Sequence, residues 1–192
     1  MGTRLWRLAI LVGAAMALMV SSAPAPAFAS APRAASGGGA TDPVVMRHIA
    51  DIKSHAPAGV LSWTVAIKPM TVTKLAGGKG AAVHTNTVWG SCGSAWMAIG
   101  NLGGGRAWIA LGWDIYYSAY WEAWNTGAFG RVANYNGGSG PVAPWSSTSW
   151  DTGYNAFLGA WTWAWGYANM AAYLYNGGVC TSNGPTASAY IT

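Results

Sequence analysis

Hydrophobic and polar residues alternate with a period of two along much of the chain after residue 59. Val60–Lys68 places Leu61, Trp63, Val65 and Ile67 on one side and mostly polar or small residues on the other. This is the side-chain period of a half-buried β-strand. Pro69 and the glycine-rich segment 77–80 predict where this strand ends.

Further strands are predicted at 83–90, 94–102 and 185–192. Gly103-Gly104-Gly105 separates the strand at 94–102 from the next apolar run, and Asn176-Gly177-Gly178 forms a second glycine-rich break. Glycine reaches the positive φ values of tight hairpin turns without steric cost. Both breaks therefore predict turns between antiparallel strands.

The segment Arg106–Trp124 holds seven aromatic residues and fits two patterns. Ile109, Leu111, Trp113 and Ile115 alternate as in a strand, whereas the later aromatics also fit the three- and four-residue spacing of a helix. Tryptophan, tyrosine and isoleucine favour strands. We therefore predict two antiparallel strands with a bend near residues 116–118, ended by a break at 125–127.

Between Trp161 and Tyr175 every aromatic residue has an odd number, and the even positions are mostly small. Period two over this length predicts two strands that turn near Asn169. A large aromatic stripe opposite small residues is most simply a core stripe. We expect Trp161, Trp163 and Trp165 to face the interior.

The first 29 residues read as a secretory signal peptide, with Arg4 and Arg7 before a thirteen-residue apolar run and a cleavage site before Ser30. An uncleaved anchor is the alternative. Residues 30–58 read as a linker that contains a short amphipathic helix, Pro43–Ser54, which either docks on the domain or belongs to a removed pro-segment. Residues 59–192 then form a tryptophan-rich β domain.

Many short strands with glycine turns predict an all-β fold, an antiparallel β-sandwich, with a small β-barrel as the second choice. In an exported chain the two cysteines, Cys92 and Cys180, are expected to form one disulfide. A free thiol pair or an intermolecular bridge are the alternatives.

Charge and motif content exclude several function classes. The full chain carries a net charge of +5, and its basic residues are too scattered for a nucleic-acid groove. No metal site, no cofactor motif and no catalytic constellation is recognisable, so we expect a protein that is not an enzyme. A glycosidase would need two of Asp114, Glu122 and Asp151 in one cleft, which the sequence does not indicate.

Tryptophan is the remaining signal, with 13 residues in the chain. In a strand, Trp108, Tyr116, Tyr120 and Trp124 would share one face of Arg106–Trp124, opposite a second aromatic face. Only one face of the strand can pack against the core unless another layer covers the second face. One aromatic face is therefore expected to be exposed, and these four residues form the predicted ligand-binding site. We expect a secreted binding module for an extracellular carbohydrate or cell-envelope polymer. The alternatives are a membrane-active, bacteriocin-like protein that contacts but does not span the bilayer, and an exported structural protein.

Overall fold

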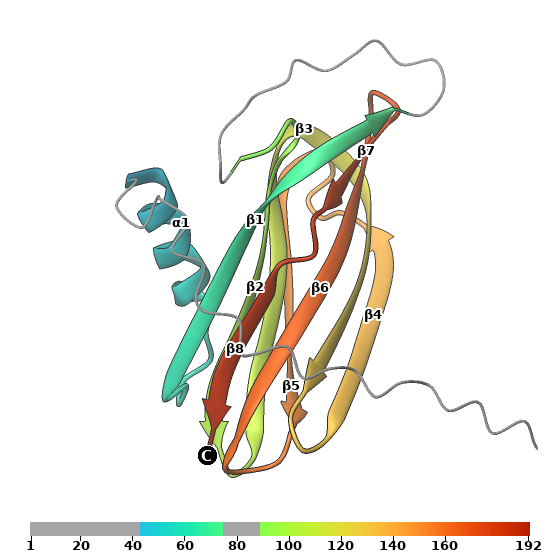
Figure 1. Ribbon diagram of the computed structural model, residues 1–192. Helices are drawn as coiled ribbons and strands as arrows, with labels where there is room; N and C mark the ends of the chain where they lie inside the picture. Colours follow the sequence, from blue (N-terminus) through green and yellow to red (C-terminus); the bar gives the residue numbers. More distant parts are fainter. Residues whose placement is uncertain (1–42, 75–88) are drawn as a thin grey trace, which may run out of the picture. The chain divides into compact units, whose positions relative to one another are not determined.

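The computed structural model describes residues 43–74 and 89–192, which belong to one compact unit, Gly37–Thr192. One helix, α1 (Pro43–Ser54), precedes an almost entirely antiparallel β structure (Figure 1). The strands are β1 (Ser62–Lys74), β2 (Gly93–Gly103), β3 (Arg106–Phe129), β4 (Ala133–Pro141), β5 (Ser147–Phe157), β6 (Thr162–Leu174), β7 (Gly178–Ser182) and β8 (Thr186–Ile191).

Some of the predicted features lie outside the described residues. These are the signal peptide at 1–29, the linker up to residue 42 and residues 83–88 of the strand predicted at 83–90. Trp89 and Gly90, the last two residues of that prediction, are not in a strand. Helix α1 has the bounds that the sequence pattern predicts.

The long strand β3 changes partners half-way along. Its first half pairs with β2 (residues 106–115) on one side and with β5 (residues 106–114) on the other. Its second half pairs with β6 (residues 119–129) and with β4 (residues 121–129). We call β1, β2, β5 and residues 106–115 of β3 the first strand group. The second strand group is β4, β6, β8 and residues 119–129 of β3, and β7 pairs with both β1 and β6.

The pairings also fix the direction of the two halves of β3. The path β1–β2–β3–β6–β7 returns to β1, and each of its five pairings is antiparallel. Five strands cannot alternate in direction around a closed path unless one of them reverses. The reversal falls in β3, whose register is irregular between Asp114 and Ala119 and again between Ala119 and Trp121 (Figure 1).

The predictions for residues 106–127 are therefore correct in part. The segment is β-structure and not helix, and its irregular region includes the bend predicted at 116–118. Its two halves run in opposite directions, as predicted, but they belong to one continuous strand and pair with other strands instead of with each other. The break predicted at 125–127 is wrong, since these residues pair with both β4 and β6.

Three other strand predictions need correction. The turn predicted near Asn169 does not exist, because β6 runs unbroken through that residue. Strand β1 continues through Pro69, and its pairing with β7 in the described part of the chain begins one residue later, at Met70, so no described β7 partner depends on the missing N–H. Strands β4, β5 and β7 were not predicted, and in β4 the sequence Asn134–Gly140 has no hydrophobic alternation to show it.

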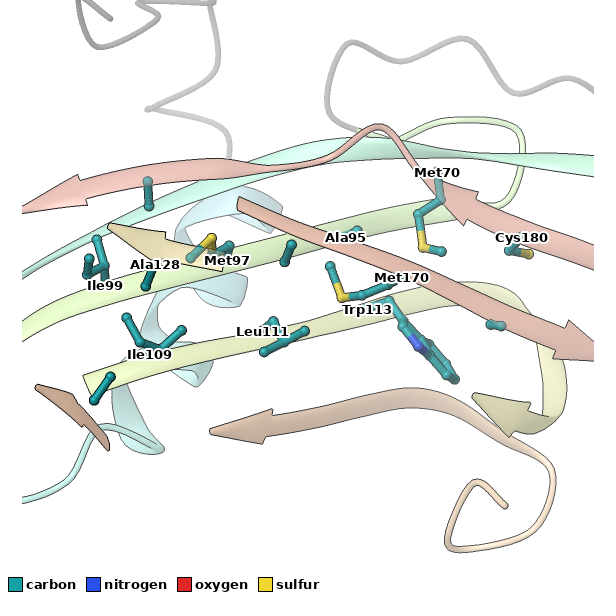
Figure 2. Packing of buried hydrophobic residues seen from close by; sticks show 14 of the residues in the cluster. Met70, Ala95, Met97, Ile99, Ile109, Leu111, Trp113, Ala128, Met170 and Cys180 are labelled. Atoms are coloured by element: carbon teal, nitrogen blue, oxygen red, sulfur yellow. The ribbon is translucent and has the colours of Figure 1, made fainter. Parts of the chain in front are cut away.

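The main core lies between the two strand groups. Figure 2 shows Met97, Leu111, Trp113 and Met170 gathered in this layer, and all four are buried. Met97 of β2 packs so closely over Gly166 of β6 that a Cβ there would collide with the terminal methyl group, Cε, of Met97. The absence of a side chain at Gly166 is thus required by the methionine that faces it.

Helix α1 covers part of the first strand group on the side away from this core. Ile52 is 1% exposed and forms a second buried cluster with Trp96, Ala98, Trp108 and Ala110. These four residues occupy even positions of β2 and β3, while the odd positions face the main core. The helix therefore covers this outward face of the sheet and buries its side chains.

The predicted disulfide between Cys92 and Cys180 is present, with a Cα–Cα distance of 5.9 Å and a sequence separation of 88 residues. Cys180 pairs with Val72 across β7 and β1, and the Cys92 backbone N–H donates to the Met70 carbonyl. Closing a loop of this length in the unfolded chain stabilises the fold by about 4–5 kcal/mol. The bond therefore fastens the segment before β2 to the strand that joins the two groups.

Candidate binding surface

Strand β6 carries its tryptophans on the outside. Trp161, which precedes the strand, and Trp163 and Trp165 within it are 68%, 69% and 49% exposed. The alternate residues Ala164, Gly166 and Ala168 are buried. The expectation that these tryptophans form a core stripe is wrong, since they point outward and Met97 fills the space over Gly166 on the inner side of the strand.

Neighbouring strands add further outward aromatic rings to this row. The ring centroids of Phe129 and Trp165 are 4.4 Å apart and the rings are stacked, and the Trp163 and Tyr190 rings meet edge to face at 5.8 Å. Tyr135 of β4 packs edge-on against Phe129 at 5.3 Å. We call this set the aromatic patch: Phe129, Tyr135, Trp161, Trp163, Trp165, Tyr167 and Tyr190.

A glycine in β3 lets two of these rings lie close to the sheet. A Cβ at Gly127 would come within 2.7 Å of Cε1 of Tyr167 and 2.9 Å of Cε2 of Phe129. Gly127 and Tyr167 are register partners, and Phe129 lies two residues further along the same side of β3. The rings of Tyr167 and Phe129 thus cover the glycine, which places them flat against the backbone.

A second aromatic group lies at the far end of the same outward face. Trp121 is the register partner of Tyr173, and the ring centroids of Tyr120 and Tyr175 are 5.3 Å apart. We call these four residues the distal aromatic group. Trp121 and Tyr175 are 40% and 55% exposed, so their rings are accessible.

Between the two aromatic groups the outward face is small and polar. Asn125 and Asn169 are register partners, both exposed, and the Asn169 amide nitrogen donates to the Asn125 side-chain oxygen at 3.2 Å. Ala123 and Ala171 form the adjacent pair. This pairing leaves other amide donors and acceptors of the two asparagines at the surface.

The outward side of the second strand group, which we call the open face, carries no charge on its strands. Strands β4, β6 and β8 contain no charged residue, and Glu122, the charged residue of β3 beyond Ala119, faces inward and is 7% exposed. Arg131 lies in the turn that follows β3. The open face therefore suits an uncharged partner better than an anionic one.

The four aromatic residues predicted as the binding site do not form one surface. Trp108 is 4% exposed beneath α1, and Trp124 is half-buried against the main core with its ring centroid 6.2 Å from that of Trp150. Tyr116 and Tyr120 are exposed, at 45% and 39%. Of the four, Tyr120 belongs to the open face.

A shift in alternation within β3 separates these residues. Before the irregular region the odd positions, such as Leu111 and Trp113, face the core, whereas beyond it the even positions, such as Thr126 and Ala128, do so. Tyr120 is the extra residue at the register shift between Ala119 and Trp121. One added residue exchanges the two faces of everything that follows.

The acidic residues are also divided between faces. Asp114 and Asp151 are outward and near neighbours on β3 and β5, since Asp114 pairs with Ser149 and Gly112 with Asp151. Glu122 lies on the inner side of the second strand group, away from both. Within residues 43–74 and 89–192, no three His, Cys, Asp or Glu side chains come together as metal ligands.

Glu122 is a buried carboxyl group whose Oε2 atom has no hydrogen-bond partner in the described part of the chain. Burial raises its pKa above the usual value of 4.5. Burial also raises the pKa of Tyr154, an effect that the nearby Thr126 hydroxyl partly offsets. Glu122 lies on the inner side of β3, opposite the open face.

No protein-family model matches the chain, and no curated protein matches it. Among solved structures, the chain is similar to the enzymatically active domain of tailspike protein 4 of bacteriophage CBA120. The identity is 14% and the TM-score 0.20, over 70% of this chain and 21% of that one. The chain thus spans about a fifth of the length of the protein it matches, and a similarity this weak carries no argument about fold or function.

Proposed function

We propose that this protein is a secreted, non-enzymatic binding module that holds an uncharged extracellular glycan on the aromatic patch. The observation that carries the proposal is the row of exposed rings at Trp161, Trp163 and Trp165 on a sheet face without charge. Sugar rings present C–H faces that pack on aromatic rings, and tyrosine hydroxyls and indole N–H groups supply hydrogen bonds at the edges. A surface of this kind on a monomer normally marks an interaction site.

Two features support the proposed extracellular location and the proposed sandwich fold. A disulfide bond is consistent with an extracellular protein, because such bonds persist in oxidising compartments. We also assign the two strand groups to the two layers of a β-sandwich. The packing of Met97 on Gly166 supports this arrangement, since it joins β2 of one group to β6 of the other through the core.

A membrane is a poorer match for this surface than a glycan. Proteins that bind lipid interfaces combine aromatic residues with lysine or arginine at the headgroup level. The strands of the open face have no such residue, and its centre is the hydrogen-bonded pair Asn125 and Asn169. Within the described residues, no helix has the length and apolar character of a membrane span.

The test is isothermal titration against a panel of neutral and anionic polysaccharides. The double variant Trp163→Ala/Trp165→Ala should lose at least about tenfold in affinity for the neutral polymer that binds. Tryptophans that become buried on binding supply much of the binding energy of an interface. Trp145→Ala is the matched control, because Trp145 is 70% exposed but lies in the turn between β4 and β5. It should bind as the unaltered protein does.

Three outcomes would count against the proposal. If no neutral polysaccharide binds, or if the double variant binds unchanged, the aromatic patch is not a glycan site. If the unaltered protein releases dye from anionic liposomes and the double variant does not, the patch is a membrane-contact surface instead. The glycan proposal requires the vesicles to stay intact.

A further inference from the structure

We infer that the ligand is one extended, neutral polysaccharide chain that lies along β6 and contacts both aromatic groups of the open face. This inference rests on the proposed function and specifies its ligand. It explains why exposed rings occur at both ends of the face, at Trp163 and Trp165 and again at Trp121 and Tyr175. A single small sugar would need only one of these groups.

The length of the site follows from strand geometry. Trp165 and Tyr173 are eight residues apart on the unbroken strand β6. At about 3.4 Å per residue their Cα atoms are about 27 Å apart, which is the span of several sugar rings. An extended polymer therefore reaches both aromatic groups, whereas a disaccharide reaches one.

The surface between the two groups fits a chain that passes over it. The outward residues there are the small Ala123 and Ala171 and the exposed pair Asn125 and Asn169, so no large ring blocks the path along the strand. The asparagine amides offer hydrogen-bond donors and acceptors to sugar hydroxyls. The centre therefore adds polar contacts between two stacking sites.

The absence of charge selects the polymer class. An anionic cell-wall polymer would be recognised through lysine or arginine side chains, and the strands β4, β6 and β8 have none. A neutral polysaccharide needs stacking and amide contacts alone. Anionic polymers should consequently gain no affinity at this face from their charge, and binding of the neutral polymer should depend little on salt concentration.

The experiment compares a disaccharide with longer oligomers of the neutral polysaccharide that binds. For the unaltered protein, affinity should rise with length until the oligomer spans both groups, because the second contact becomes intramolecular. Trp121→Ala should lower the affinity of the long oligomer about tenfold and leave that of the disaccharide unchanged. Trp121→Phe, which keeps a stacking ring, should restore most of the loss.

Phe157→Ala is the control for removal of an exposed ring, since Phe157 is 57% exposed on β5 of the first strand group. Circular dichroism and thermal unfolding of each variant separate a loss of binding from a loss of fold. Light scattering tests whether a second copy of the chain occupies the distal aromatic group. A dimer that Trp121→Ala dissociates, with glycan affinity unchanged, would overturn the inference.

The two proposals fail in distinguishable ways. If short and long oligomers bind equally well through Trp163 and Trp165, and Trp121→Ala has no effect, the extended site is wrong while the glycan-binding function stands. If no oligomer binds, or Trp163→Ala/Trp165→Ala leaves binding intact, the proposed function itself is wrong.

Discussion

Two outward sheet faces of this protein carry tryptophans in the same way but differ in what covers them. On the first strand group, Trp96 and Trp108 lie on the outer side of β2 and β3 and are 3% and 4% exposed. On the second, Trp163 and Trp165 lie on the outer side of β6 and are 69% and 49% exposed. Helix α1 accounts for the difference, because Ile52 packs into the cluster that contains Trp96 and Trp108.

The comparison shows that alternation within a strand does not decide burial. Each strand separates its side chains into two sets, but whether the outer set meets solvent depends on an element elsewhere in the chain. Twelve residues of helix, more than a hundred residues before β6 in sequence, make one tryptophan face structural. The other face remains available for a partner.

The largest effect should come from weakening the cover on the first face. Ile52→Ala deletes a fully buried side chain and should lower the free energy of unfolding by about 2–4 kcal/mol. It should also shift tryptophan fluorescence to longer wavelength, because Trp96 and Trp108 gain access to water. Urea denaturation and emission spectra measure both effects.

Met46→Ala provides the matched change on the same helix, since Met46 is 51% exposed. Its effect should stay within about 0.5 kcal/mol, as for most surface substitutions. If Ile52→Ala changed neither stability nor emission, α1 would not be the element that buries the first face.

The next prediction compares the loss of stability on alanine substitution at two glycines that lie beneath aromatic rings. A Cβ at Gly112 would come within 2.6 Å of the Trp96 ring and 2.6 Å of the Trp150 carbonyl oxygen. Trp96 is held between the sheet and α1, so Gly112→Ala should cost about 2–3 kcal/mol through overpacking. Thermal and urea unfolding measure the loss.

The counterpart on the open face is Gly127, beneath Tyr167 and Phe129. Those rings can move toward solvent, so Gly127→Ala should cost less than about 1 kcal/mol. It should instead weaken the proposed glycan binding, because the displaced rings belong to the aromatic patch. Equal losses of stability at Gly112 and Gly127 would contradict the distinction between a covered and an open face.

The same comparison explains what the sequence predicted and what it did not. The strands at 94–102 and 185–192, the glycine turn at 103–105 and the helix at 43–54 follow local rules and match the structure within one or two residues. The disulfide followed from the number of cysteines. These features depend on neighbours in sequence, which a single chain displays.

The candidate site depended on distant contacts and was predicted less well. In β6 the outward side carries mostly aromatic rings and the inward side mostly small residues with Met170 and Leu174, so polarity could not indicate the inner side. The useful signal was size, since small residues fit beneath Met97. In β3 one extra residue at Tyr120 exchanged the faces, so Trp108 and Trp124 could not share a surface.

The last predicted effect, smaller than those at Ile52 and Gly112, concerns the interior behind the open face, where Glu122 lies on the inner side of β3. Because burial raises the folded-state pKa of Glu122 above its usual value of 4.5, the unfolded state releases the proton more readily. The contribution of Glu122 to stability should therefore be greatest below about pH 4.5 and be lost as the pH rises through the raised pKa.

Glu122→Gln removes the titrating group and keeps its size. The variant should match the unaltered protein in acid and exceed it at neutral pH by on the order of 1 kcal/mol, or about 2–4 °C in Tm. Asp151→Asn, at an exposed site, controls for the loss of one negative charge. A Tm difference between Glu122→Gln and the unaltered protein that stayed constant from acid to neutral pH would show that the carboxyl is not desolvated. If instead the difference grows with pH while any glycan affinity is unchanged, Glu122 acts on the interior alone, and the proposed binding depends only on the uncharged outer side of the same strand.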